Sequence, residues 1–279
     1  MPGTLYVVAT PIGNLGDLSP RAAEVLRSVK AVAAEDTRHT RQLFAHLGAP
    51  APAMLSLPAF DERGRMGAVL GRLAAGEDVA LCTDAGTPGV SDPGQHLVAA
   101  AWEAGARVVP VPGPCAAVAA LVASGLPSDR FLVYGFLPRK GGRRTGALAW
   151  LARIPATLVL YEAGNRTGAT LRELHEALGA RPAAVARELT KLHEEIARGS
   201  LDALAARFAD GARGEVTLVV AGAADGEGAR DEPEEPLDAE LRRRAAAGEA
   251  PSAIAREVAR ARGLRRADVY AELEKLKAR

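Results

Sequence analysis

Short apolar runs alternate with segments of helical spacing along the first 124 residues of the chain. The runs predict strands at residues 5–9, 31–34, 55–57, 79–82 and 107–111. The segments between and after them predict helices at residues 21–28, 42–47, 66–75, 96–104 and 116–123. Strands and helices that alternate in this way are typical of a mainly parallel sheet with helices on its faces.

The same elements continue after residue 124 in a second block. Its apolar runs predict strands at residues 131–136, 157–161, 183–187 and 216–221, with helices at residues 167–178 and 201–208. We therefore predict an α/β protein with two α/β domains, at residues 1–116 and 117–222.

The last part of the chain has a different character. Residues 223–236 are an expected acidic linker, because positions 225–235 hold six acids, one base and no apolar period. Helical spacing returns at residues 237–279, where Gly248 and Gly263 would end helices and Ser252 would cap one. From residue 238 onward there are eleven Lys or Arg and seven Asp or Glu. This pattern indicates either a helix-turn-helix-like module or a helical appendage that packs on the body or on a partner subunit.

A long loop at residues 83–94, TDAGTPGVSDPG, follows the predicted strand at 79–82. Gly, Pro, Asp, Thr and Ser are the residues that build tight turns. Ordinary connections in α/β proteins are two to six residues long, so a longer ordered loop is more often functional than a simple connector. Because ligands bind beyond the carboxyl ends of strands in open α/β sheets, we expect a ligand here.

Polar clusters follow several other predicted strands. Residues 35–41, EDTRHTR, are either a helix start with a capping Thr37 or the edge of a site that orients a hydroxyl and holds phosphate. Residues 138–144, PRKGGRR, are either a solvated interdomain loop or a phosphate-binding one. Residues 10–20 hold two glycines but lack the P-loop lysine and the dinucleotide-binding spacing, so a nucleoside triphosphate or NAD is disfavoured.

The composition of the chain bears on nucleic-acid binding, localisation and metal binding. The 279 residues are 48% hydrophobic, and the formal net charge of +1 gives no global argument for binding nucleic acid. The first apolar run is too short for a signal peptide, and no run has transmembrane length, so we expect a cytoplasmic protein with Cys82 and Cys115 as free thiols. No Cys/His spacing suggests a metal site.

Six blocks of sequence carry a resemblance to a known family. They are LYVVATPIGNLGDLS, AAEDTRHTRQL, ALCTDAGTPGVSDPG, VVPVPGPCAAVAAL, PSDRFLVYGFLPRK and VARELTKLHEE. In this order they resemble the ribosomal RNA small subunit methyltransferase I family, within the tetrapyrrole methylase-like (class III) methyltransferases. The resemblance covers residues 5–222 almost without a gap, and residues 237–279 resemble the helical tail of many members.

The resemblance implies two α/β domains of the tetrapyrrole methylase type with a cleft between them. It also implies S-adenosylmethionine as methyl donor, 2′-O-methylation of a decoding-centre cytidine in 16S ribosomal RNA, and a homodimer. The chain departs from the family pattern at one single residue and at one pair of residues. Cys115 stands where the family usually has Ser, and Gly164-Asn165 stand where it usually has Pro-His. Asn165 can form hydrogen bonds but cannot act as a general base, so any role of the family histidine is in doubt here.

Methyl transfer to a ribose hydroxyl needs alignment of donor and acceptor, and a base or a positive charge to favour the ionised hydroxyl. We expect catalysis from Asp36 or Glu188 as proton acceptor, with Arg38 and Lys191. His193 is a further possible base, and Cys115 is discounted as a nucleophile because nothing supplies its base. Donor contacts are expected from Pro11, Ile12, Asp84, Ala85, Gly86, Thr87, Val90, Cys115, Ala116, Tyr161, Glu162, Leu189 and Thr217. RNA phosphates would meet Arg38, Arg41, Arg139, Lys140, Arg143, Arg144 and Arg166.

Two other functions stay open at this point. One is methylation of a tetrapyrrole ring carbon (a precorrin-type C-methyltransferase), which would not need the basic loop. The other is a nucleic-acid-binding module without catalysis, which would not need polar clusters at several strand ends. The sequence leaves open which carboxylate acts as base, and whether the substrate is naked RNA or the assembled small subunit.

Overall fold

The computed structural model describes residues 1–224, 236–262 and 264–277. The chain divides into two compact units, residues 1–223 and residues 224–279. The expected acidic linker at 223–236 falls almost wholly on residues 225–235, which lie outside the described residues, as does Gly263. Among the described residues, no helix has both the length and the apolar character needed to cross a membrane.

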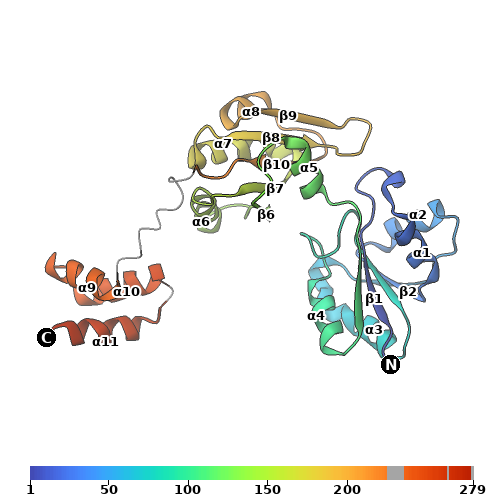
Figure 1. Cartoon of the computed structure of the whole chain (residues 1–279), viewed down its shortest axis with the longest axis horizontal. Helices are drawn as coiled ribbons and strands as arrows, with labels where there is room; N and C mark the ends of the chain where they lie inside the picture. Colours follow the sequence, from blue (N-terminus) through green and yellow to red (C-terminus); the bar gives the residue numbers. More distant parts are fainter. Residues whose placement is uncertain (225–235, 263, 278–279) are drawn as a thin grey trace. The chain divides into compact units, whose positions relative to one another are not determined.

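The first sheet is wholly parallel, as the spacing predicts (Figure 1). Its strands run in the order β3-β2-β4-β1-β5. They are β1 (Thr4–Val8), β2 (Ala31–Ala34), β3 (Ala53–Ser56), β4 (Val79–Cys82) and β5 (Arg107–Val111). The helices between them are α1 (Pro20–Ser28), α2 (Thr37–His46), α3 (Glu62–Ala74) and α4 (Gln95–Glu103).

Helices cover both faces of this sheet. Successive residues of β4 alternate between two apolar clusters: Leu81 packs with α3 and α4, and Ala80 packs with α1 and α2. A strand buried on both faces is apolar along its whole length, which is why β2 and β4 appear in the sequence as unbroken apolar runs. All their side chains are therefore committed to the core, and only the loops beyond their carboxyl ends remain for chemistry.

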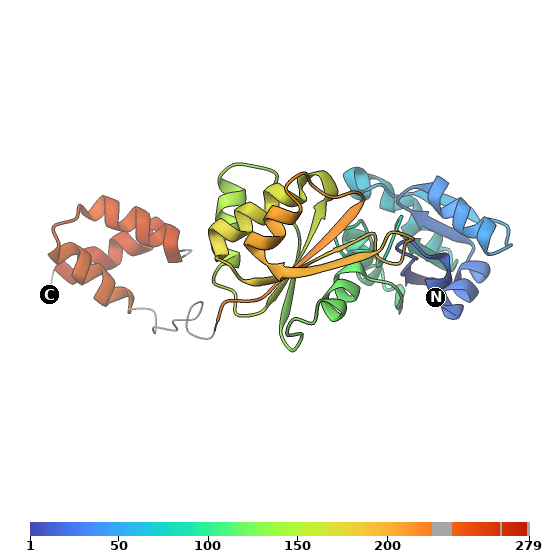
Figure 2. The same cartoon turned by 90° about the horizontal axis from the view of Figure 1, so that it is seen from above.

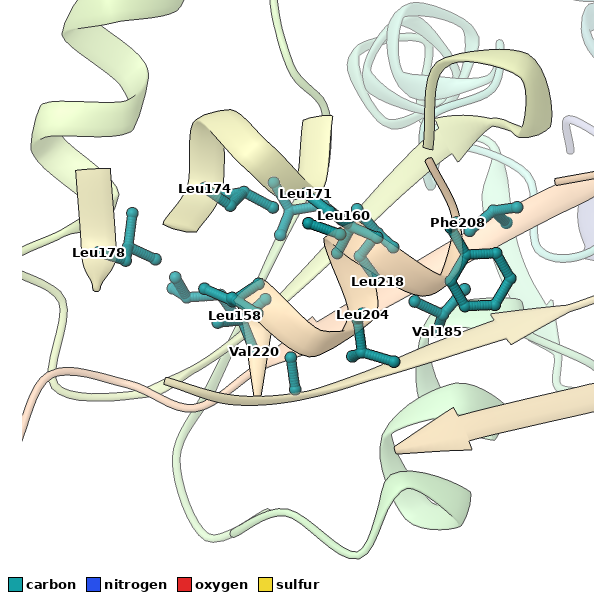
Figure 3. Packing of buried hydrophobic residues seen from close by; sticks show 14 of the residues in the cluster. Leu158, Leu160, Leu171, Leu174, Leu178, Val185, Leu204, Phe208, Leu218 and Val220 are labelled. Atoms are coloured by element: carbon teal, nitrogen blue, oxygen red, sulfur yellow. The ribbon is translucent and has the colours of Figure 1, made fainter. Parts of the chain in front are cut away.

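The second sheet is mixed, with strand order β6-β7-β10-β8-β9. Only β6 and β7 run parallel to each other. Its strands are β6 (Phe131–Phe136), β7 (Thr157–Ala163), β8 (Pro182–Arg187), β9 (Glu195–Ser200) and β10 (Glu215–Val220). One face packs on α6 (Gly142–Leu151), α7 (Thr167–Leu178) and α8 (Leu201–Arg207), through leucines shown in Figure 3.

The opposite face of the second sheet is covered by α5 (Ala116–Ser124). Its buried Ala117, Ala120 and Leu121 pack against β7, β8 and β10. These contacts support the boundary that we propose between two α/β domains near residue 116. The sequence did not predict helix α6 or strand β9. Helix α6 occupies part of the expected basic loop. Strand β9 is an edge strand that pairs only with β8, so it can be polar and has no apolar run to reveal it.

The described residues of the C-terminal unit form three helices that pack on one another (Figure 1 and Figure 2). They are α9 (Leu237–Ala246), α10 (Pro251–Arg262) and α11 (Arg266–Lys277). Leu241, Ile254, Val258, Val269 and Leu273 form their small core. Gly248, at φ 79°, follows the end of α9 as expected, but Ser252 is not a cap, because α10 already begins at Pro251. A helix-turn-helix-like role for this unit remains a prediction.

Candidate active site

Three loops of the first sheet are tied together beyond its strands. The backbones of Thr10 and Gly86 exchange two hydrogen bonds, of 2.8 and 3.1 Å. The hydroxyl of Thr87 donates to the carbonyl of Pro114 at 3.0 Å. Gly86 has φ 81°, and a Cβ there would lie 3.4 Å from a methyl of Ile12. The loops after β1, β4 and β5 therefore form one surface, in which Gly86 has a backbone conformation that favours glycine.

The loop at residues 83–94 also reaches the second sheet. Ser91 has φ 64°, a left-handed conformation that is uncommon for a residue other than glycine. A Cβ on Gly135 of β6 would come within 2.8 Å of the Oγ of Ser91, so only glycine fits at residue 135. Such strain costs about 1–3 kcal/mol and persists where the surroundings fix the loop, commonly at functional sites.

These elements enclose a cavity of about 390 Å³. A volume of this order suits a small-molecule ligand. Its wall includes these residues from the expected donor set: Ile12, Ala85, Gly86, Thr87, Val90, Cys115, Ala116, Tyr161, Glu162, Leu189 and Thr217. Two expected donor contacts, Pro11 and Asp84, do not line it.

Sequence reasoning missed part of the cavity wall: Ser91, Asp92, Phe136, Ala163, Gly164, Ala186, Gly214, Glu215 and Val216. Ser91 and Asp92 lie inside the loop at residues 83–94, so the composition of that loop could have identified them. The others are brought in by sheet register, because β10 pairs with both β7 and β8 and places Thr217 opposite Tyr161 and Ala186. A single sequence does not reveal antiparallel pairing between strands so far apart.

Two aromatic rings form one side of the cavity. The rings of Phe136 and Tyr161 lie 5.6 Å apart, and Phe136 is 57% exposed. Burial raises the pKa of Tyr161 to about 12, with a further contribution from the neighbouring thiol of Cys115. Cys115 is the N-cap residue of α5 but makes no side-chain capping bond, and the backbone N–H of Ala117 in the first turn of that helix meets the Tyr161 hydroxyl instead.

Glu162 is a buried carboxylate fixed from three sides. It accepts hydrogen bonds from the Thr170 hydroxyl at 2.6 Å, from Arg166 Nη2 at 2.9 Å and from the backbone N–H of Ala163 at 2.8 Å. Its side chain is 1% exposed. Charge-assisted bonds of this kind hold the carboxylate in one orientation. Arg166 is thus already paired at the site, which weakens the expectation that it binds RNA phosphate.

The four expected catalytic residues form two separate pairs. Asp36 caps α2 and binds the guanidinium of Arg38, with Nη2 to Oδ2 at 2.5 Å. Lys191 Nζ lies 3.0 Å from Glu188 and 3.1 Å from Glu215. None of Asp36, Arg38, Glu188 and Lys191 lines the cavity itself, but Glu215, which Lys191 binds, does.

The charged partners make both expected bases weak proton acceptors. Hydrogen bonds from Arg38 hold the pKa of Asp36 well below its usual value. A hydrogen bond from Lys191 likewise lowers the pKa of Glu188. Partial burial opposes the charge on Lys191, but these carboxylates outweigh it and its pKa rises. A carboxylate stabilised in its charged form has little tendency to take a proton near neutral pH.

The Lys191 segment is nevertheless held in a strained geometry beside the first loop. Glu188 and Thr190 have φ values of 50° and 67°. A Cβ on Gly13 would lie 2.5 Å from the side chain of Lys191, so the loop after β1 and the β8–β9 connection are in close contact. His193, the other possible base, is exposed and does not line the cavity.

One expected phosphate contact is wrong. Arg144 lies in the first turn of α6 and is 8% exposed, because its guanidinium is directed into the protein. It binds the carboxylate of Glu173, the Thr170 hydroxyl at 2.9 Å and the carbonyl of Pro138 at 3.0 Å. The remaining basic candidates, Arg41, Arg139, Lys140 and Arg143, are exposed.

Asp36, His39 and Asp84 bring three potential metal-ligand atoms within 4.8 Å of one another, the one such group found among residues 1–224, 236–262 and 264–277. Their atoms already have protein partners. Arg38 binds Asp36, and Asp84 meets both His39 Nδ1 at 3.1 Å and the backbone N–H of Asp36 at 3.1 Å.

Gly164 shows why the chain departs from Pro-His at residues 164–165. Its N–H donates to the carbonyl of Gly214 at 3.2 Å, a bond that proline cannot make. A Cβ there would lie 2.3 Å from the carbonyl oxygen of Ala212. The turn before β10 packs directly onto Gly164, so in this backbone only glycine fits.

Comparisons with known proteins bear on what such a cavity serves. The sequence profile of the tetrapyrrole (corrin/porphyrin) methylases matches residues 4–205. A protein of Xylella fastidiosa described as ribosomal RNA small subunit methyltransferase I is 52% identical over 82% of this chain and 85% of its own length. A protein of Synechocystis with the same description is 47% identical over 96% of both chains.

Solved structures agree with the fold. Uroporphyrin-III C-methyltransferase from Thermus thermophilus, in complex with S-adenyl homocysteine, superposes with a TM-score of 0.56. The alignment covers 78% of this chain and 97% of that one, at 22% identity. At this identity the likeness concerns the fold of the two α/β domains.

Proposed function

We propose that this chain, which belongs to the ribosomal RNA small subunit methyltransferase I family of tetrapyrrole (corrin/porphyrin) methylases, transfers a methyl group from S-adenosylmethionine to ribosomal RNA. The observation that carries the proposal is the identity of 47% over 96% of both chains to a relative described by that name. The finer proposal is that the acceptor is the ribose 2′-hydroxyl of a decoding-centre cytidine in 16S ribosomal RNA.

The cavity suits a sulfonium donor in size and charge. Its volume is about 390 Å³, and its wall carries the carboxylates of Glu162 and Glu215. Negative charge in a partly desolvated site favours a cation. The backbones at Ala85, Gly86 and Thr87 and the Phe136–Tyr161 ring pair would hold the rest of the donor.

We propose that the chain contributes chiefly alignment. The donor is already activated, so holding it in line with the acceptor oxygen in a site closed to water supplies much of the acceleration. The positive charge of Lys191, one hydrogen bond from the cavity wall through Glu215, would favour the ionised hydroxyl.

RNA would reach the cleft over the exposed basic residues Arg139 and Lys140, which precede α6, and Arg143 in its first turn. We further propose a homodimer that acts in the cytoplasm, and contact of the C-terminal unit with RNA, in keeping with its excess of Lys and Arg after residue 238.

The test is transfer of labelled methyl from S-adenosylmethionine to small ribosomal subunits that lack the modification, followed by mapping of the product. A 2′-O-methylated cytidine is the expected result. Naked 16S RNA, assayed in parallel, shows whether the assembled subunit is required. Binding of the donor without transfer to either substrate would refute the proposed substrate and keep the fold assignment.

The tetrapyrrole alternative is tested by the same protein with uroporphyrinogen as acceptor. The basic segment at 139–143 favours RNA as the acceptor, since its side chains could bind RNA phosphates and a tetrapyrrole acceptor does not require them. The cavity, with its partly apolar wall and three carboxylates, argues against a nucleic-acid-binding protein without catalysis. Absence of donor binding would favour that alternative.

A further inference from the structure

The three carboxylates on the cavity wall differ in what they contact. Glu162 is fixed by Thr170, Arg166 and its own backbone, and Glu215 binds Lys191. Asp92, by contrast, accepts no hydrogen bond from any other residue in the described parts of the chain (1–224, 236–262 and 264–277). It is therefore the carboxylate that is free to receive a proton from a bound substrate.

The backbone fixes where this carboxylate lies. Asp92 follows the left-handed Ser91, whose Oγ is packed over Gly135 of β6. Directly after it, Pro93 and Gly94 are buried, and the carbonyl of Pro93 accepts a hydrogen bond from Gly89 N at 3.1 Å. The side chain is half-buried in the cavity wall and extends from a loop whose two ends are held. A general base needs such positioning before its acidity matters.

The surroundings of Asp92 favour the protonated form of its carboxyl group. Burial is the largest influence, and the negative charges of Glu35 after β2, Asp84 in the same loop and Glu215 at the start of β10 add to it. Together they raise the pKa of Asp92 to about 7. Tyr161 of β7 also faces this carboxylate and stays neutral there. A base whose pKa lies near the working pH is the most effective proton acceptor.

We propose that Asp92 is the general base of the methyl transfer, a role that rests on the function proposed above. Its carboxylate takes the proton of the ribose 2′-hydroxyl as that oxygen bonds to the methyl carbon. The O–H bond breaks and the O–C bond forms. The bond between methyl and sulfur breaks, and its electron pair remains on sulfur as a neutral thioether. Asp92 then returns the proton to water.

The kinetic test uses the full chain, unmodified small subunits and single-turnover transfer from pH 5.5 to 9. For the wild type we expect a rate that rises with pH and then becomes constant, with a midpoint at or below about 7, the pKa of Asp92 in the free chain, because a bound sulfonium cation lowers it. Asp92→Asn, nearly the same in shape, should lose about 100-fold or more of the rate and also lose this pH dependence, while donor affinity by calorimetry stays within about threefold. Asp129→Asn makes the same chemical change at an exposed residue outside the cavity and should match the wild type.

A second test needs no donor. A carboxyl whose pKa rises from 3.8 to about 7 on folding binds its proton more tightly in the folded state. The urea midpoint of the wild type should therefore fall relative to that of Asp92→Asn as the pH rises from about 4 to about 7, and the difference should be constant above that. Asp129→Asn should show no such trend.

The outcomes separate this role from the proposed function. Transfer by the wild type with an unchanged rate and pH profile in Asp92→Asn would overturn the role alone. A loss of donor affinity as large as the loss of rate would also overturn it and make Asp92 a donor-binding residue. No transfer by the wild type to subunits or naked RNA would overturn the proposed function, and the role of Asp92 with it.

Discussion

Replacing Arg144 tests which arginines of the basic segment at residues 138–144 stabilise the fold and which bind RNA. Replacing it by Met keeps most of the side-chain volume and removes the guanidinium. The bonds to Thr170 at 2.9 Å and Pro138 at 3.0 Å are lost, together with the ion pair to Glu173. We therefore expect a loss of stability rather than a loss of RNA affinity.

The magnitude follows from what is left without a partner. Breaking a fully buried ion pair costs about 3–5 kcal/mol, but the side chain of Glu173 is 41% exposed and regains water. A hydrogen bond to a charged group contributes about 1.5–3 kcal/mol, and the Thr170 hydroxyl keeps its bond to Glu162. We expect the free energy of unfolding to fall by about 2–4 kcal/mol. The neighbouring Arg143→Met, at an exposed residue, should change it by less than about 0.5 kcal/mol.

The assay is urea unfolding followed by tryptophan fluorescence in a Trp102→Phe background. Trp102 lies on α4 of the first sheet and is exposed, whereas Trp150 lies on α6, with its ring 6.1 Å from that of Tyr134. The remaining signal thus reports on the second sheet. A constant slope against urea shows that the midpoint shift is a stability change.

For RNA affinity we expect the opposite ranking of the two variants. Arg143→Met should reduce the slope of log affinity against log salt by up to about 1, whereas Arg144→Met should leave it unchanged. The reasoning is refuted if Arg144→Met costs less than about 1 kcal/mol, or if it changes the salt slope as much as Arg143→Met does.

Three further changes test other parts of the structure. Gly164→Ala places a Cβ 2.3 Å from a carbonyl oxygen, so it should lower stability by about 1–3 kcal/mol in urea unfolding; an unchanged midpoint would show that the turn before β10 moves freely. Burial raises the pKa of Cys82 to about 12, so a thiol reagent at pH 8 should modify Cys115 alone in the folded protein, and donor should protect it; two reactive thiols before unfolding would contradict this. Hydrogen bonding to Arg187 lowers the pKa of Glu195, so Glu195→Gln should destabilise the protein at pH 7, with the difference shrinking as the pH falls below 4.5; a loss independent of pH would contradict this account.

The sequence by itself determined most of the first domain. Strands buried on both faces are continuous apolar runs, so the runs at 31–34 and 79–82 coincide with β2 and β4. The loop at 83–94 is identified by its turn-forming residues, which act locally. The resemblance of six sequence blocks to one family likewise depends only on the order of residues, and the comparisons confirm it.

Only the tertiary structure decided what individual charged side chains do. Arg143 and Arg144 are adjacent and chemically identical, yet the turn of α6 directs one to solvent and the other to Glu173 and Thr170. Asp36 and Asp92 both follow a strand of the first sheet, but Arg38 fixes the charge of the first, whereas burial and three neighbouring acids raise the pKa of the second. The pKa of a carboxylate and the exposure of an arginine depend on groups brought near by folding, and spacing along the chain does not encode them.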